Sequence, residues 1–385
     1  MAFFKFENIK ISSVATSVPT KVVRCEDFYT LFGEEAVKKF QESTGIKEFR
    51  KTSKYQTASD LCYVAAENII KTKNVDRKEI RALVFIAHST DYRRPATACV
   101  LHKRLGLDKD CMSFDVNLGC SAFVYGLNII CSLMANSDVN KALLLVGETL
   151  SKMTNSKDKS VAMLFGDGGS AILLEKTRED SSIMGILKTS GDGYKSIIAP
   201  AGGFRNLDVT SEEFMWPDGN VRTLYNTYMQ GEDVFAFTIS SVPDTVKEFW
   251  AKTETTAKDY DCFAFHQANL FINKMLCRKL GLEMAKMPLS LDRFGNPSAA
   301  AIPMVICDTY GKDEESKELN VLMCGFGVGL SWGVCSAIIN VKDILPIIET
   351  DEVFEEGIIK RPEDLLRNSL KKLNEMCSAH RNLKI

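Results

Sequence analysis

The sequence predicts an α/β fold made of two similar halves. Short apolar runs, typical of buried strands, alternate with helical patterns along most of the 385 residues. This alternation indicates βαβ units and a mostly parallel sheet that helices cover on both faces. The halves also repeat an order of motifs, since FGDGGSAILL begins at Phe165 and FGVGLSWGVCSAII begins at Phe326. We therefore expect a duplicated fold whose halves meet near residue 180.

Hydrophobic periodicity locates the elements in chain order. Strands are expected at Ala82–Ala87, Ser113–Val116, Ala142–Val146, Ala171–Leu174, Cys262–Phe265 and Asn320–Cys324. Helices are expected at Ala58–Lys71, Ala96–Leu105, Ala122–Met134, Val234–Thr253, Leu270–Leu280 and Ala299–Thr309. Residues 190–226 are rich in glycine and polar side chains, so they are expected to form long loops, which are often functional in a compact domain.

Two segments need a separate interpretation. Val321–Val341 is nearly uncharged and about as long as a membrane span, but four glycines interrupt it. It is better explained as a strand, a glycine-rich bend and a second strand. Beyond Lys342 the chain becomes charged, and Leu366, Leu370, Leu373 and Cys377 form one apolar stripe after Pro362. We expect a helix there that packs on the body or on a partner subunit, with domains at residues 1–180, 181–345 and 346–385.

Composition narrows the class of protein. A net formal charge of −2 suggests neither a nucleic-acid partner nor an anionic membrane surface. The twelve cysteines are scattered without a CxxC pair, and MAFFKFENIK lacks the apolar core of a secretory signal. Both features favour free thiols in a reducing cytoplasm. Four histidines leave little material for a metal site, and neither a metal nor a cofactor is expected.

Three residues stand where α/β sheets gather functional groups, after a strand or at a helix start. Cys120 follows Gly119 at a helix start, where unpaired amides and the helix dipole favour a thiolate. His266 follows the strand Cys262–Phe265, and Asn296 precedes the helix Ala299–Thr309. Taken singly, each has a structural alternative: a buried thiol, a core histidine and a helix cap. Together, a thiolate and two hydrogen-bond donors fit acyl transfer through a thioester.

The chain resembles the β-ketoacyl-acyl-carrier-protein synthase III family of the thiolase superfamily from about residue 8 to residue 342. The most specific motifs are DVNLGCSAFVYGL around Cys120, LFGDGGSAILL from Leu164, HQAN from His266, FGNPSAAAIP from Phe294 and GFGVGLSWG from Gly325. This resemblance implies two βαβαβαββ halves in a layered αβαβα sandwich, and a homodimer. It also implies that an acyl group is supplied by coenzyme A or an acyl-carrier protein, and that a malonyl-carrier protein extends it.

The resemblance assigns roles to individual residues. Cys120 corresponds to the nucleophile that forms the acyl thioester, and His266 and Asn296 correspond to the pair that holds the malonyl thioester carbonyl while CO2 leaves. The backbone N–H groups of Cys120 and Gly329 would form the oxyanion hole. A side chain at Gly327 would crowd the thioester.

The positions expected to bind substrate depart from the family pattern. Lys39 and Ser43 stand where many members have a tryptophan and an arginine that enclose the adenine of coenzyme A. Lys159 replaces a second adenine-stacking arginine and can offer charge but no planar stack. Phe271 replaces an arginine that docks the carrier protein. Three cations on the same helix, Lys274, Arg278 and Lys279, remain available for an acidic carrier.

Arg94 stands where the family usually has an apolar residue that reaches the partner's acyl pocket. It either selects a polar, acidic or short acyl group or lies on a shifted, solvated loop.

The sequence therefore predicts decarboxylative Claisen condensation in specialised lipid or polyketide synthesis. Two alternatives remain at this stage. Cys120 passes its acyl group to an alcohol or amine without condensation, or the chain is a non-catalytic partner of a synthase pair. The presence of Cys120, His266 and Asn296 argues against the non-catalytic role.

Overall fold

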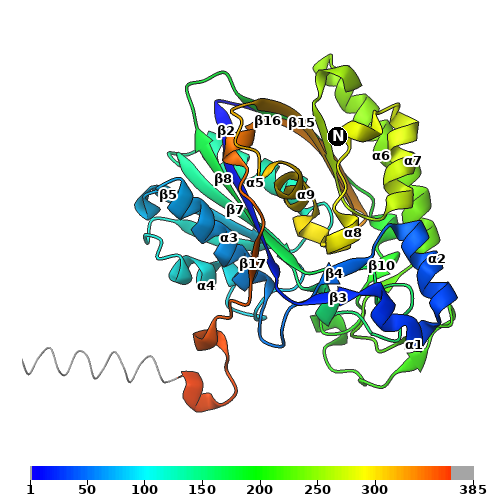
Figure 1. Ribbon diagram of the computed structural model, residues 1–385. Helices are drawn as coiled ribbons and strands as arrows, with labels where there is room; N and C mark the ends of the chain where they lie inside the picture. The colour runs from blue at the N-terminus through cyan, green and yellow to red at the C-terminus, as the bar shows by residue number, and fades with distance from the viewer. Residues whose placement is uncertain (1, 366–385) are drawn as a thin grey trace, which may run out of the picture.

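The computed structural model describes residues 2–365 and contains two layered β-sheets (Figure 1). The six-stranded sheet has the order β17-β2-β8-β7-β5-β6, and the five-stranded sheet has the order β1-β9-β16-β15-β14. The strands of the first sheet are β2 (Ile9–Pro19), β5 (Ile80–Ile86), β6 (Met112–Val116), β7 (Lys141–Glu148), β8 (Gly168–Lys176) and β17 (Ile348–Thr350). Those of the second are β1 (Ala2–Glu7), β9 (Ser182–Thr189), β14 (Cys262–Phe265), β15 (Glu318–Gly327) and β16 (Ser331–Asn340).

Helices form the other three layers of the sandwich, as Figure 1 shows. The central layer contains α5 (Ala122–Ala135) and α9 (Ala301–Tyr310), which pack against one face of both sheets. The helices α3 (Ala58–Thr72) and α4 (Thr97–Arg104) cover the outer face of the six-stranded sheet. The helices α6 (Gly231–Thr253) and α7 (Leu270–Leu280) cover the outer face of the five-stranded sheet. The predicted αβαβα sandwich is confirmed.

Alternation of side chains along each strand separates the layers. In β5, Val84 and Ile86 face the central helices, whereas Leu83 and Phe85 face α3 and α4. Because both faces of the central strands are covered, they are apolar at every position rather than at every second one. This is why the sequence shows them as continuous apolar runs.

The prediction of a mostly parallel sheet is wrong, because both sheets are mixed. Parallel pairing joins β17 to β2, β7 to β5, β5 to β6 and β14 to β15, and the remaining neighbours are antiparallel. The antiparallel pairs include β15 and β16, which a three-residue turn connects. A turn that short reverses the chain, whereas a parallel neighbour needs a long crossover. This pair of strands confirms the interpretation of Val321–Val341, and among residues 2–365 no helix is long and apolar enough to cross a membrane.

Strand β2 was not predicted from the sequence, because hydroxyl side chains break its apolar pattern. Ser13, Thr16 and Ser17 are nevertheless fully buried. Thr16 Oγ1 lies 2.8 Å from Ser170 Oγ, and Ser17 Oγ donates to the Leu61 carbonyl at 2.7 Å. Such hydrogen-bond partners remove most of the penalty for burying a hydroxyl group.

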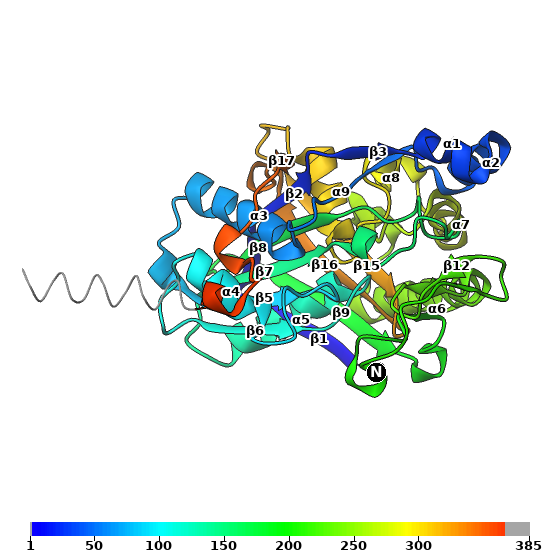
Figure 2. The same ribbon diagram turned by 90° about the horizontal axis from the view of Figure 1, so that it is seen from below.

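Residues 197–229 form a capping segment beside α6, as Figure 2 shows around β12. The segment contains two small antiparallel pairs. These strands are β10 (Ile197–Ile198) with β13 (Tyr228–Met229), and β11 (Phe214–Met215) with β12 (Val221–Arg222).

A fully buried arginine, Arg222, holds the capping segment to the body. Its guanidinium pairs with Asp158 and with Asp218, and it contacts the stacked rings of Trp216 (5.4 Å) and Tyr228 (5.3 Å). The hydrogen bond from Arg222 lowers the pKa of Asp218 to about 2. A buried arginine needs this full set of partners, because an unpaired buried charge is strongly destabilising.

The remaining α-helices and strands include the small antiparallel pair of β3 and β4. They are β3 (Val22–Arg24), β4 (Glu48–Arg50), α1 (Tyr29–Phe32), α2 (Glu34–Thr44) and α8 (Leu291–Phe294).

After β17, the chain crosses the surface over α3 and α4. The amide of Phe354 donates to Asp60, and the Tyr92 hydroxyl donates to the Gly357 carbonyl at 2.6 Å. A short 3-10 helix, Pro362–Leu365, begins at the predicted proline. The predicted apolar stripe from Leu366 to Cys377 lies outside the described residues.

Candidate active site

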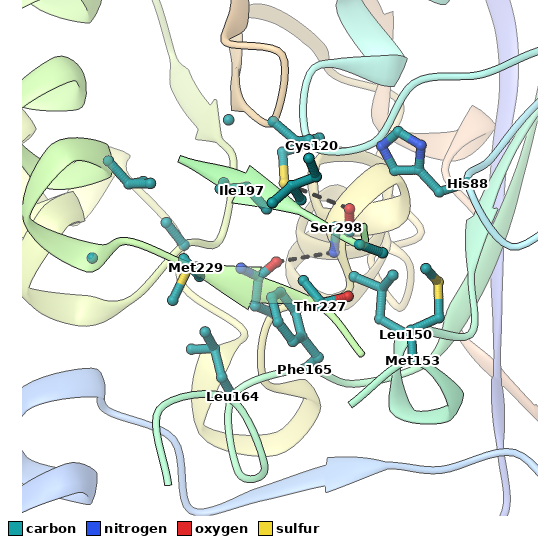
Figure 3. A pocket seen from close by; sticks show the side chains of 18 of the residues that line it. His88, Cys120, Leu150, Met153, Leu164, Phe165, Ile197, Thr227, Met229 and Ser298 are labelled. Carbon is teal, nitrogen blue, oxygen red and sulfur yellow. Dashed lines mark hydrogen bonds between the residues drawn. The ribbon is translucent and has the colours of Figure 1, made fainter. Parts of the chain in front are cut away.

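A cavity of about 620 Å³ opens beside the central layer, and all three candidate residues line it. Figure 3 shows its interior, where Cys120 lies close to Ser298 and side chains of Leu150, Met153, Phe165, Ile197 and Met229 form apolar walls. Cys120 comes from the first half of the chain, and His266 and Asn296 come from the second. The structure therefore brings together residues that are up to 176 positions apart in sequence (296 − 120).

Cys120 lies immediately before α5, as the sequence predicts. The turn is closed by a hydrogen bond from the Ala122 amide to the Gly119 carbonyl at 2.8 Å. Ser121 Oγ lies 2.7 Å from Ser331 Oγ, which ties the start of α5 to the first residue of β16. The Cys120 sulfur lies 3.5 Å from Ser298 Oγ. The nucleophile is thus fixed by neighbours on both sides.

The electrostatics at Cys120 differ from the expected thiolate. Burial raises the pKa of the Cys120 thiol above its ordinary value of 9.0. The Ser298 hydroxyl and the backbone N–H groups of Val328 and Cys120 act in the opposite direction. Loss of hydration outweighs these donors, so the thiol is mainly protonated at neutral pH.

His266 directly follows β14, and its backbone is pinned to the sheet because its amide donates to the Cys324 carbonyl at 2.8 Å. The side chain is only 2% exposed and contacts the edge of the Phe326 ring. Burial lowers the pKa of His266 to about 3. The imidazole is therefore neutral at physiological pH and acts as a neutral hydrogen-bonding group.

Asn296 is held by the FGDGG segment of the other half. Its amide donates to the Leu164 carbonyl at 2.9 Å, and its carbonyl accepts from the Gly166 amide at 3.2 Å. Gly166 is required there because a Cβ atom would lie 2.0 Å from the Phe294 carbonyl oxygen. The side-chain Oδ1 accepts from the Ser298 amide at 3.0 Å. This bond orients Oδ1 away and leaves the Asn296 NH₂ group as the donor for a ligand.

The glycine-rich loop contacts the nucleophile closely. A Cβ atom on Gly327 would lie 2.9 Å from the Cys120 sulfur, so only glycine fits there. The loop amide that reaches the sulfur is that of Val328. The predicted role of Gly329 as a donor to the acyl oxygen stays a prediction. A Cβ atom on Gly329 would meet Ser331 instead of Cys120.

The expected substrate-binding residues divide into two groups. Phe271 and Gly327 line the cavity, and the Phe271 ring stacks on Phe235 at 5.4 Å. Arg94 is exposed on the loop between β5 and α4, and Lys159 is exposed beside the capping segment, where its amide donates to Asn220. Neither one lines the cavity of its own chain. Lys274 and Arg278 are exposed on α7, also outside the cavity.

Sequence reasoning missed three groups at the site: Ser298, the amide of Val328, and His88 in the cavity wall. Ser298 has a positive φ of 48°, which turns its hydroxyl toward the sulfur directly after the FGNP motif. A signal for His88 existed, because it follows an apolar strand just as His266 does. Within residues 2–365, no three His, Cys, Asp or Glu side chains are grouped to hold a metal ion.

This arrangement of side chains defines a class of enzyme. A cysteine before a central helix faces a neutral imidazole and an amide donor between two stacked sheets. Such a site belongs to thiolase-like enzymes that work through a cysteine thioester.

Comparisons with known proteins agree with that class. Residues 114–193 match the family model for 3-oxoacyl-[acyl-carrier-protein] synthase III, and residues 250–339 match the model for its C-terminal part. A putative 3-oxoacyl-[acyl-carrier-protein] synthase 3 of Campylobacter jejuni is 30% identical over 88% of this chain and 96% of that protein. A β-ketoacyl-[acyl-carrier-protein] synthase III of Lactobacillus helveticus is 31% identical over 86% of this chain and 98% of that protein.

Solved structures show the same relationship. A 3-oxoacyl-(acyl-carrier-protein) synthase of Burkholderia xenovorans superimposes with a TM-score of 0.86 and 33% identity, covering 91% of this chain and 99% of that one. The chain belongs to the 3-oxoacyl-[acyl-carrier-protein] synthase III family, the condensing ketosynthases of the thiolase superfamily.

Proposed function

We propose that the protein loads an acyl group onto Cys120 and condenses it with a malonyl-type thioester on a carrier protein. The observation that carries the proposal is the meeting of Cys120, His266 and Asn296 at one apolar cavity. In the first step the Cys120 sulfur attacks the donor thioester, and the carrier thiol leaves with the proton of the cysteine. The backbone N–H groups of Cys120 and Val328, which both act on the sulfur, support an oxyanion hole that stabilises the negative charge on the acyl oxygen.

In the second step the malonyl C–C bond breaks and CO2 leaves. The electron pair remains as an enolate, whose oxygen accepts hydrogen bonds from His266 and Asn296. The enolate carbon then attacks the acyl carbonyl, and the Cys120 sulfur departs and regains a proton. The product is a β-ketoacyl thioester on the carrier. A neutral histidine and an amide suit this step because both donate without exchanging a proton.

The buried imidazole argues against simple acyl transfer. Transfer to an alcohol or amine needs a general base, and a group with a pKa of about 3 is too weak a base at neutral pH. Asn296 also has a direct task only in condensation. We therefore place acyl transfer without condensation second.

The wider setting of this activity is part of the proposal. The exposed cations Lys274, Arg278 and Lys279 on α7 support docking of an acidic carrier protein. Lys159 has no planar group for an adenine, which supports a role in specialised lipid or polyketide synthesis.

All cysteines in the described part of the chain are free, which supports a cytoplasmic location. The half-exposed edge strand β6 supports a homodimer, to be tested by light scattering.

The test separates loading from condensation. Incubation with acyl-coenzyme A and acyl-carrier donors should add one acyl mass to the wild type and none to Cys120→Ala. The Cys120→Ala protein should still release CO2 from a malonyl-carrier donor. Stoichiometric acylation of Cys120→Ala would overturn the proposed nucleophile. Absence of CO2 release from every malonyl donor, together with discharge of the acyl-enzyme by an alcohol or amine, would favour the transferase.

A further inference from the structure

His88 is a second histidine in the cavity, and its backbone is rigidly held. It follows β5 by two residues, and its amide donates to the Glu148 carboxylate at 2.8 Å. The same carboxylate accepts from the Ser89 amide at 3.1 Å and from the Ser89 hydroxyl at 2.6 Å. Glu148 is fully buried. This network fixes the end of β5 and with it the position of the His88 ring.

The two ring nitrogens of His88 have different surroundings. Nδ1 lies 2.5 Å from Asn117 Oδ1. Nε2 is buried and has no hydrogen-bond partner within the described residues. With Nδ1 donating to the Asn117 oxygen, Nε2 carries a lone pair that faces no donor. A buried polar atom without a partner lowers stability, so such an atom beside a cavity is better accounted for by a ligand that completes the bond.

The unpaired nitrogen lies close to the reacting cysteine. A Cβ atom on Gly119 would lie 2.6 Å from His88 Nε2, so the imidazole packs against the residue that precedes Cys120. Figure 3 shows the His88 ring beside Cys120 and Ser298, above Leu150 and Met153. An acyl group attached to Cys120 would therefore lie beside the His88 ring within its first few carbon atoms.

The wall below His88 is mainly apolar. Leu150, Met153 and Phe165 line it, together with the polar side chain of Thr227. An entirely alkyl acyl group would leave His88 Nε2 unpaired in a dry site. A substituent that both donates and accepts hydrogen bonds would pair with this nitrogen whichever ring tautomer is present. A hydroxyl group meets that requirement without adding charge.

We propose that His88 determines substrate specificity and that the preferred acyl donor carries a hydroxyl group on one of the carbons next to the thioester. The inference rests on the proposed function, because it concerns the acyl group that Cys120 accepts. It adds a polar residue inside the cavity to the selection that the sequence suggested for Arg94.

The experiment measures loading alone. The rate of Cys120 acylation is followed by intact mass with pantetheine thioesters of hexanoic, 2-hydroxyhexanoic and 3-hydroxyhexanoic acid. We expect one hydroxyacyl donor to have at least a tenfold higher kcat/KM than the hexanoyl donor in the wild type, equivalent to about 1.4 kcal/mol. His88→Leu should bring this ratio close to one. His88→Gln, which keeps a hydrogen-bonding group, should retain part of it.

The matched control removes a histidine outside the cavity. His102 lies on α4 and contacts the Asp108 carbonyl, so His102→Leu should leave the ratio unchanged. Equal rates for all three donors in the wild type, or the same ratio in wild type and His88→Leu, would overturn the inference while leaving the proposed function intact. Absence of loading by every donor would overturn the proposed function itself, and the inference with it.

Discussion

The reacting end of the cavity and the capping segment opposite it are held in place in different ways. At the reacting end, backbone hydrogen bonds to neighbouring elements fix His266 and Asn296. The capping segment is tied to the body chiefly through side chains, above all that of Arg222. It also has a backbone hydrogen bond, from the Thr227 amide to the Met153 carbonyl. Backbone bonds are independent of side-chain identity, whereas side-chain ties change with single substitutions. The chemistry is therefore fixed by the fold, and the shape of the pocket is open to variation.

Asn296 is the strongest test of the reacting end. Asn296→Ala removes one donor from the enolate, and loss of one such donor costs about 3 kcal/mol, or roughly a hundredfold in rate. The measurement is CO2 release from a malonyl-carrier donor in the Cys120→Ala background. Asn296→Asp is the companion variant, since it keeps an oxygen that accepts from the Ser298 amide but replaces the NH₂ donor by a carboxylate oxygen, whose negative charge should lower the rate at least as much. A decrease of less than threefold in Asn296→Ala would contradict the assigned role.

At the reacting end, the pH dependence of the rates should distinguish decarboxylation from acyl loading. His266 has a pKa of about 3, so decarboxylation by Cys120→Ala should be constant between pH 5 and 9. Loading of the wild type should instead increase with pH up to the raised pKa of Cys120, by up to about tenfold per pH unit, because only the thiolate reacts. Stopped-flow release of the donor thiol follows loading. An inflection near pH 6.5 that disappears in His266→Gln would show that this histidine titrates during decarboxylation.

Arg222 tests the capping segment, and its effect on chemistry should be the smallest. Arg222→Met leaves Asp158 buried without its partner, which typically costs about 3–5 kcal/mol. We expect a lower melting temperature and a KM for acyl donors at least threefold higher. Decarboxylation in the Cys120→Ala background should stay within twofold, because the reacting end does not depend on this arginine.

Two further results complete the Arg222 test. Arg222→Lys keeps the charge but loses the planar contacts with Trp216 and Tyr228, and should give an intermediate KM. Equal losses of loading and decarboxylation would remove the distinction between the two regions.

The difference between the regions also explains what the sequence could predict. Cys120, His266 and Asn296 each follow a recognisable motif at an element boundary, so their convergence was predictable. The contact of the Val328 amide with the sulfur was not predicted, because a glycine-rich turn has no periodicity that sets which amide faces the sulfur. Arg94 is exposed on the loop between β5 and α4, and its expected reach into the acyl pocket of a partner subunit stays a prediction.

Other parts of the structure could not be predicted from the local sequence pattern. Strand β2 is buried through hydroxyl pairs with distant residues such as Ser170, and no pattern in its own sequence reveals them. The contacts of Arg222 with Asp158 and Asp218 join segments that look like polar loops when read separately. In each case the deciding partner lies far along the chain, where periodicity gives no information.

Each sheet takes an edge strand from the far end of the chain. Strand β1 pairs with β9 in the five-stranded sheet, and β17 pairs with β2 in the six-stranded sheet. During synthesis β17 leaves the ribosome more than 300 residues after β2, so the backbone of β2 has no neighbour on that side until residues near 350 emerge. A chain that terminates before β17 would carry an open sheet edge, which is a template for aggregation. Synthesis of β17 thus closes this edge of the sheet that supports the nucleophile.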